Sequence, residues 1–150
     1  MAATWLYRVA AVVFLLFAAG HTYGFLSFRP SSMEGRAVYE SMNSVQFVED
    51  GRSYTYGNFY RVFGLSATVS MLFWAFLCWH LGELARTNPG MIGALGWGLF
   101  AVQVAGAVLS FLYLGPPPML FALVVALLVG LAAWLVRPGH KLPDPSMGER

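Results

Sequence analysis

The sequence predicts an all-α integral membrane protein, a four-helix bundle with a short amphipathic helix in its first extramembrane loop. Of its 150 residues, 58% are hydrophobic and only 11% are charged, whereas soluble domains average about 45–50% and 25%. A soluble domain of this size buries only about 70% of the surface of its unfolded chain, which is too little to hide so much apolar area. The apolar residues also gather into four long stretches separated by polar or turn-forming residues.

Each apolar stretch is long enough to cross a bilayer as a helix. The hydrocarbon core is about 30 Å thick and an α-helix rises about 1.5 Å per residue, so about 20 apolar residues suffice. We therefore predict one four-helix transmembrane domain over residues 1–150, with spans at about 5–28, 60–85, 91–114 and 119–136.

The first span also resembles a signal peptide. Arg8, the apolar run that follows it and the small residues Ala18-Ala19-Gly20 imitate a charged region, an apolar core and a cleavage site. The apolar character continues through Phe28, however. We therefore expect an uncleaved first span.

The loop between the first two spans is too long to be a simple turn. Ser31 and Glu34 have the spacing of a capping box, and Val38, Met42 and Val45 recur at helical spacing. These features predict an amphipathic helix over about 33–48 that lies on the membrane surface or covers one end of the bundle. Asp50-Gly51 predicts a turn after it.

The two later connections predict different geometries. Asn88-Pro89-Gly90 indicates a tight turn, which would make the second and third spans antiparallel neighbours. Pro116-Pro117-Pro118 indicates an extended link into the fourth span, because proline interrupts a helix.

The distribution of basic residues predicts the orientation. With four spans both termini lie on one side, which carries five basic residues against four on the other: Arg8, Arg86, Arg137, Lys141 and Arg150 against Arg29, Arg36, Arg52 and Arg61. Because cytoplasmic loops carry the excess of Lys and Arg, we expect both termini in the cytoplasm. The tail at 138–150 is expected to be a loosely ordered cytoplasmic end.

Several classes of site are disfavoured. The lone Cys78 excludes an intrachain disulfide and cysteine-based metal clusters, and a net charge of +2 does not indicate a nucleic-acid partner. Bundles of this kind often hold haem between two histidines, but His21 and His80 would differ in depth by roughly 24 Å on antiparallel helices. We therefore expect no metal and no cofactor.

Polar residues gather at one end of the first two spans. Polar side chains are costly in a membrane and usually have a reason to be there, so we predict an outward-facing polar and aromatic pocket with these candidate ligand-binding residues: His21, Thr22, Arg52, Tyr56, Asn58, Tyr60, Arg61 and Gln103. Other interpretations stay open. Tyrosines gather at interfaces without a ligand, arginines meet lipid headgroups, and Gln103 serves equally to join helices.

Two segments carry a resemblance to a family. Residues 20–24, Gly-His-Thr-Tyr-Gly, resemble the Gly-His-Thr-x-Gly signature of small bacterial four-span membrane proteins without an assigned function. Residues 55–65, which end in Phe-Gly-Leu, are similar to their second signature, but Gly57 and Asn58 stand where that pattern has tryptophan and aspartate. The resemblance implies the four-span topology and a bacterial inner membrane, and it points to His21 and residues 56–60. The missing carboxylate puts an acid–base role at 58 in doubt, and no reaction is implied.

Two functions compete on these observations. The first is binding of a lipid-like or amphipathic small molecule near His21, with enzymatic activity left open. The second is an accessory or structural subunit of a larger membrane complex, since the fourth span is uniformly apolar and no complete catalytic set is visible. Transport is weaker, because the chain has neither a broken helix nor paired carboxylates. The expected partners are membrane lipids, further copies of this chain or a larger membrane complex.

Overall fold

The computed structural model describes residues 1–137, and the predicted tail at 138–150 lies outside the described residues. Contacts divide the chain into two compact units, Leu15–Phe73 and the remainder, Met1–Phe14 with the chain from Trp74 onwards. Two long helices, α1 (Ala2–Ser27) and α3 (Tyr56–Thr87), pass from one unit to the other. Each unit therefore holds part of both helices.

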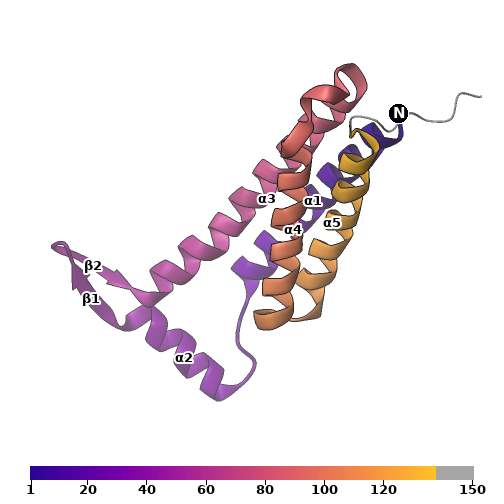
Figure 1. Ribbon diagram of the computed structural model, residues 1–150. Helices are drawn as coiled ribbons and strands as arrows, with labels where there is room; N and C mark the ends of the chain where they lie inside the picture. The colour runs from indigo at the N-terminus through magenta and orange to yellow at the C-terminus, as the bar shows by residue number, and fades with distance from the viewer. Residues whose placement is uncertain (138–150) are drawn as a thin grey trace, which may run out of the picture. The chain divides into compact units, whose positions relative to one another are not determined.

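Four helices are long and apolar enough to cross a membrane: α1, α3, α4 (Gly93–Tyr113) and α5 (Pro116–Leu135) (Figure 1). The predicted all-α class with four apolar helices is confirmed. Large apolar side chains remain exposed on every one of them, for example Leu16, Phe63, Phe111 and Leu127. Such surfaces suit hydrocarbon rather than water. The chain is an integral membrane protein.

The expected extended link at Pro116-Pro117-Pro118 is wrong. These three prolines form the first turn of α5, which therefore begins at Pro116 rather than at residue 119. The amides of a first turn have no partner inside the helix, so proline loses nothing there, and its fixed φ suits the helix. Gly115, with a φ of 97°, makes the turn out of α4.

The other spans differ from their predicted limits at the ends. α1 stops at Ser27, shortly before Pro30, and α3 extends further than predicted at both ends, from Tyr56 to Thr87. A short 3-10 helix, η1 (Pro89–Met91), follows the turn at Asn88, so α4 starts at Gly93 rather than at residue 91.

The unit Leu15–Phe73 contains the amphipathic helix α2 (Met33–Ser44) and a β-hairpin. The predicted helix continued to residue 48, but the chain becomes extended at Val45, and β1 (Gln46–Glu49) pairs antiparallel with β2 (Arg52–Thr55). Asp50 and Gly51 both have positive φ, 50° and 74°, as a tight hairpin turn requires. The chain leaves the helix after Ser44 because the residues that follow pair with β2. The N-cap is Ser32, which accepts from the Gly35 amide, rather than Ser31.

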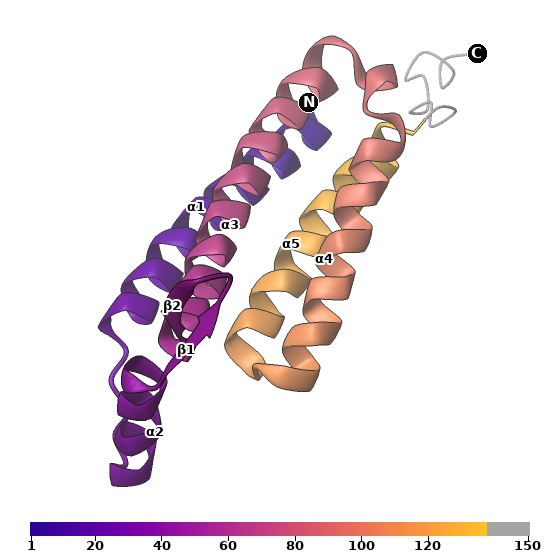
Figure 2. The same cartoon turned by 90° about the vertical axis from the view of Figure 1, so that its left-hand side faces the viewer.

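In the other unit, α4 and α5 run side by side from the turn at Gly115 (Figure 2). Each buries one stripe at helical spacing. The stripe of α4 consists of Gly96, Leu99, Gln103, Ala107 and Ser110, and that of α5 of Ala122, Val125, Ala126, Val129, Ala132 and Ala133. The first half of α1 adds Tyr7 and Phe14 to this core, with the Phe14 and Phe121 rings edge to face at 5.5 Å.

Candidate functional site

In the unit Leu15–Phe73, His21 and Thr22 lie on the face of α1 that contacts α3. The Nε2 atom of His21 is 3.0 Å from the carbonyl oxygen of Gly64, and the hydroxyls of Thr22 and Thr68 are 2.9 Å apart. A carbonyl only accepts, so Nε2 of His21 is the donor in this contact. Thr22 also donates to the carbonyl of Ala18 at 2.7 Å. These contacts form the α1–α3 joint, in which both candidate side chains contact protein.

Aromatic rings continue the α1–α3 joint towards the start of α3. The ring of Phe25 stacks on His21 at 5.9 Å and lies 5.0 Å from the ring of Tyr60. Gly64 makes this possible, since a Cβ atom there would lie 2.2 Å from the Phe25 ring. Tyr60, another predicted ligand residue, thus packs against α1.

Asn58 caps the N-terminus of α3. Its Oδ1 accepts from the backbone amide of Thr55 at 3.0 Å and from the Thr55 hydroxyl at 2.6 Å, while the amide of Asn58 donates to the Thr55 hydroxyl at 3.2 Å. This is the reciprocal arrangement of a capping box, with Asn58 in the position that Glu or Gln usually occupies. It explains why α3 begins at Tyr56.

Arg61 connects α3 to the end of α2. Its Nη2 donates to Oδ1 of Asn43 at 3.3 Å, and Asn43 in turn donates to the carbonyl of Tyr39 at 2.7 Å. The helices approach closely here, because a Cβ atom on Gly57 would lie 2.4 Å from Oδ1 of Asn43. Gly57 is therefore the residue of α3 against which α2 packs.

Arg52 lies apart from these residues at the turn end of the hairpin, opposite Glu49 in the strand register. β2 carries it roughly 10 Å from Thr55, while Gly64 lies about 12 Å further along α3 from Tyr56. The hairpin projects beyond the start of α3 (Figure 1). The structure therefore does not bring Arg52 together with His21.

Gln103 belongs to the other unit. It is 6% exposed and lies in the buried stripe of α4. The eight predicted residues thus fall into four places: the hairpin tip, the start of α3, the α1–α3 joint and the α4 stripe.

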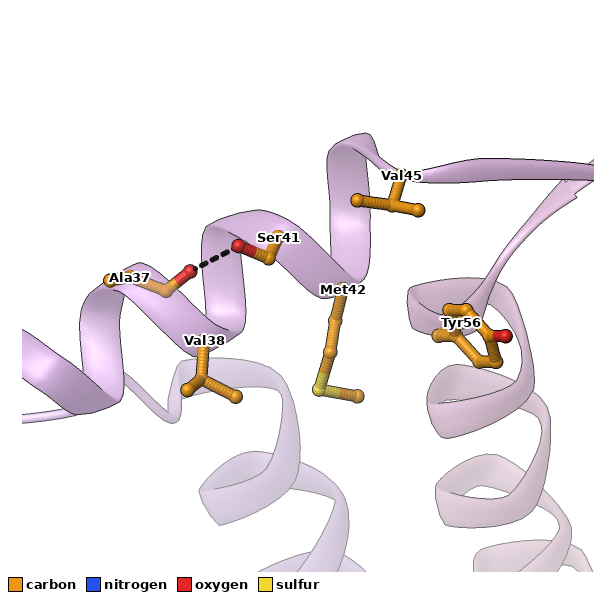
Figure 3. Close-up of a pocket in the computed structure, with 6 residues that line it drawn as sticks. All are labelled: Ala37, Val38, Ser41, Met42, Val45 and Tyr56. Carbon is orange, nitrogen blue, oxygen red and sulfur yellow. Dashed lines mark hydrogen bonds between the residues drawn. The ribbon is translucent and has the colours of Figure 1, made fainter.

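An open hollow lies where α2 meets the start of α3. We call it the α2 groove; it has a volume of about 350 Å³ and is lined by Ala37, Val38, Ser41, Met42, Val45 and Tyr56. Figure 3 shows Val38 and Met42 pointing to one side of α2, with Tyr56 across from them on α3. The Ser41 hydroxyl donates to the Ala37 carbonyl at 2.8 Å, so the groove is apolar.

Of the groove residues, only Tyr56 was among the predicted ligand-binding set. The helical spacing of Val38, Met42 and Val45 was the available signal for the others, and it predicted the helix without predicting the groove. Phe47 supports Tyr56 from the hairpin, since it lies 5.2 Å from that ring and stacks on Phe59 at 5.7 Å.

No group of three or more His, Cys, Asp or Glu residues arranged to hold a metal ion is found within residues 1–137. No protein-family model, curated protein or solved structure matches the chain.

Proposed function

We propose that this integral membrane protein binds a lipid-like, amphipathic molecule, whose apolar part occupies the α2 groove. The observation that carries the proposal is the groove itself, about 350 Å³ in volume and lined by apolar side chains at the start of α3, one of the four helices long and apolar enough to cross a membrane. Small-molecule sites typically have volumes of about 300–1,000 Å³ and are mostly apolar, with a few polar groups.

The groove suits a hydrocarbon chain. Val38, Met42 and Val45 supply aliphatic surface on α2, and the ring of Tyr56 forms the opposite wall. Each methylene group that leaves water for such a surface contributes about 0.8 kcal/mol. A short stretch of acyl chain is therefore enough for measurable binding.

Arginine supplies the polar end of the proposed site. The exposed side chain of Arg61 is held beside α2 by Asn43, the residue next to Met42. A guanidinium group in this position suits a phosphate or carboxylate headgroup. His21 and Thr22 act as positioning residues in this proposal, since they join α1 to α3, the helix that carries the groove residue Tyr56.

Photoaffinity labelling tests the groove. The protein is placed in phosphatidylglycerol vesicles with a trace of phosphatidylglycerol that carries a diazirine on one acyl chain, and label is measured on the tryptic peptide 37–52. We expect Val38→Asn to lower this labelling roughly tenfold, since burying a valine is worth about 1.5 kcal/mol or more.

The matched control is Val48→Asn. Val48 lies on β1 outside the groove, is 75% exposed and stands in the same tryptic peptide. It should keep the labelling of the unmodified protein. Equal labelling of peptide 37–52 in Val38→Asn and in the unmodified protein would reject the proposal.

A second candidate is an accessory subunit of a larger membrane complex. Met33 and Val48 are large apolar side chains that stay exposed outside the groove, and they offer a contact for another protein. Purification in a gentle detergent distinguishes the two functions. Stoichiometric partner proteins favour the complex, whereas a lone chain or a homo-oligomer counts against it.

A further inference from the structure

We propose a second lipid site in the other unit, which binds the phosphate of an anionic lipid headgroup beside Arg137. The site is a pocket of about 130 Å³ between the start of α4 and the end of α5, which we call the Arg137 pocket. Its lining includes Gly90, Gly93 and Trp97 on one side and Ala133 and Arg137 on the other. It shares no residue with the α2 groove, so it does not depend on the function proposed above.

Arg137 supplies the charge of this pocket. Its guanidinium carbon lies 4.9 Å from the centre of the Trp134 ring, which orients the group by a cation–π contact. The ion pairs found within residues 1–137 join Arg8 and Arg86 to Glu83, so no carboxylate of the described chain neutralises Arg137. A cation that is held in place and makes no ion pair within residues 1–137 is suited to an anionic ligand.

A second hydrogen-bond donor lies close to Ala133, one of the residues that line the pocket. Tyr7 is completely buried and its hydroxyl has no hydrogen-bond partner. A Cβ atom on Gly96 would lie 2.7 Å from this hydroxyl and 3.2 Å from Cβ of Ala133, which lines the pocket. Gly96 therefore brings the Tyr7 hydroxyl close to Ala133, because a side chain on this residue would occupy the space between them.

The unpaired hydroxyl favours an occupant rich in oxygen. A buried donor without a partner destabilises a protein, because the group loses its hydrogen bonds to water and gains none in return. A ligand oxygen at the inner end of the pocket, or a water that the ligand holds there, supplies the missing acceptor. A volume of about 130 Å³ exceeds the space that one water needs.

Two features favour a lipid headgroup as the source of the phosphate. Trp97 and Trp134 flank the pocket near the ends of two spans, where tryptophan prefers the headgroup level of the membrane. Basic pockets between transmembrane helices are also a recurrent way of binding anionic headgroups. Free phosphate offers the same chemistry and is therefore a separate arm of the test.

The test measures the thermal stability of the full chain in detergent during titration with phosphatidylglycerol or with inorganic phosphate. We expect Arg137→Gln to weaken the apparent affinity for phosphatidylglycerol about tenfold. Tyr7→Phe, which removes only the hydroxyl, should weaken it severalfold without lowering the stability of the lipid-free protein. The matched control is Arg86→Gln, which removes an arginine outside the pocket that is already paired with Glu83.

The outcomes separate the sources. Stabilisation by phosphatidylglycerol alone that is lost in Arg137→Gln supports a headgroup site. Stabilisation by inorganic phosphate to the same extent shows that free phosphate is the ligand and overturns the lipid assignment. If Arg137→Gln and Arg86→Gln bind phosphatidylglycerol equally well, the Arg137 pocket is not a phosphate site.

Discussion

Gly64 and Gly57 are two positions on α3 where neighbouring segments leave no room for a side chain. At Gly64 the neighbour is the Phe25 ring of α1, and at Gly57 it is Asn43 of α2. The structure gives them a physical role, since close approach of helices in a membrane depends on small residues.

Gly64→Ala should destabilise the protein by about 1–3 kcal/mol, because the new methyl group overlaps the Phe25 ring. Thermal unfolding in detergent measures the effect. Gly20→Ala on α1 is the matched control, since nothing lies within 4 Å of a Cβ atom there, and alanine is the better helix former. Equal stability of the two variants would contradict the close packing at Gly64.

The sequence identified His21 and Thr22 but not their partners. A histidine within an apolar span is conspicuous, whereas the backbone carbonyl of Gly64 leaves no mark on a sequence. Thr68 is one hydroxyl among several on α3, and only the rotation of the helix shows that it faces Thr22. Hydrogen bonds of this kind between membrane helices are worth about 0.6 kcal/mol on average.

At the scale of single elements, local chemistry decides where each one begins and ends. α3 begins where Thr55 and Asn58 form the capping box, and α5 begins with a turn of three prolines. Proline at Pro116 was expected to interrupt the helix. Its ring is favourable, however, in the first turn of a helix. Proline therefore ends a helix that precedes it and is favourable at the start of a helix that follows it.

Asn58→Ala should destabilise the start of α3 by about 1 kcal/mol, because the Asn58 side chain accepts hydrogen bonds from both the backbone amide and the hydroxyl of Thr55. Asn58→Asp should keep most of the stability, since a carboxylate accepts the same hydrogen bonds from Thr55. Thermal unfolding of both variants, with Ser66→Ala as an exposed control on the same helix, checks this. A loss in Asn58→Asp as large as that in Asn58→Ala would be inconsistent with a capping role.

The end of α2 shows competition between two patterns. Val45 continues the helical spacing of Val38 and Met42, yet the chain leaves the helix there and enters the hairpin. Asp50-Gly51 signals a tight turn, and such a turn joins two strands when the flanking residues can pair. The sequence predicts the turn at Asp50-Gly51, but it does not predict that the residues on its two sides pair as β1 and β2.

At the scale of the whole molecule, the predicted orientation remains to be measured. Ser44 on α2 and Thr87 at the end of α3 are both exposed, while the native Cys78 is fully buried. If both termini are cytoplasmic, Ser44→Cys should react with a membrane-impermeant maleimide added to intact cells, and Thr87→Cys should react only after the membrane is opened.

The unmodified chain is the control for this labelling, because burial of Cys78 should keep it unreactive in both conditions. The reverse pattern, with Thr87→Cys labelled from outside, would place the termini outside the cytoplasm. Labelling of both cysteines in intact cells would contradict a four-span arrangement.

The number and type of the membrane spans could be derived from the sequence, because a helix in lipid satisfies its own backbone hydrogen bonds and needs only a long enough apolar segment. Tertiary structure decided the rest. His21 faces Gly64, Tyr56 closes a groove with α2, and the Tyr7 hydroxyl lies against Gly96. Each of these contacts joins residues far apart in the chain, and it depends on which helix faces meet.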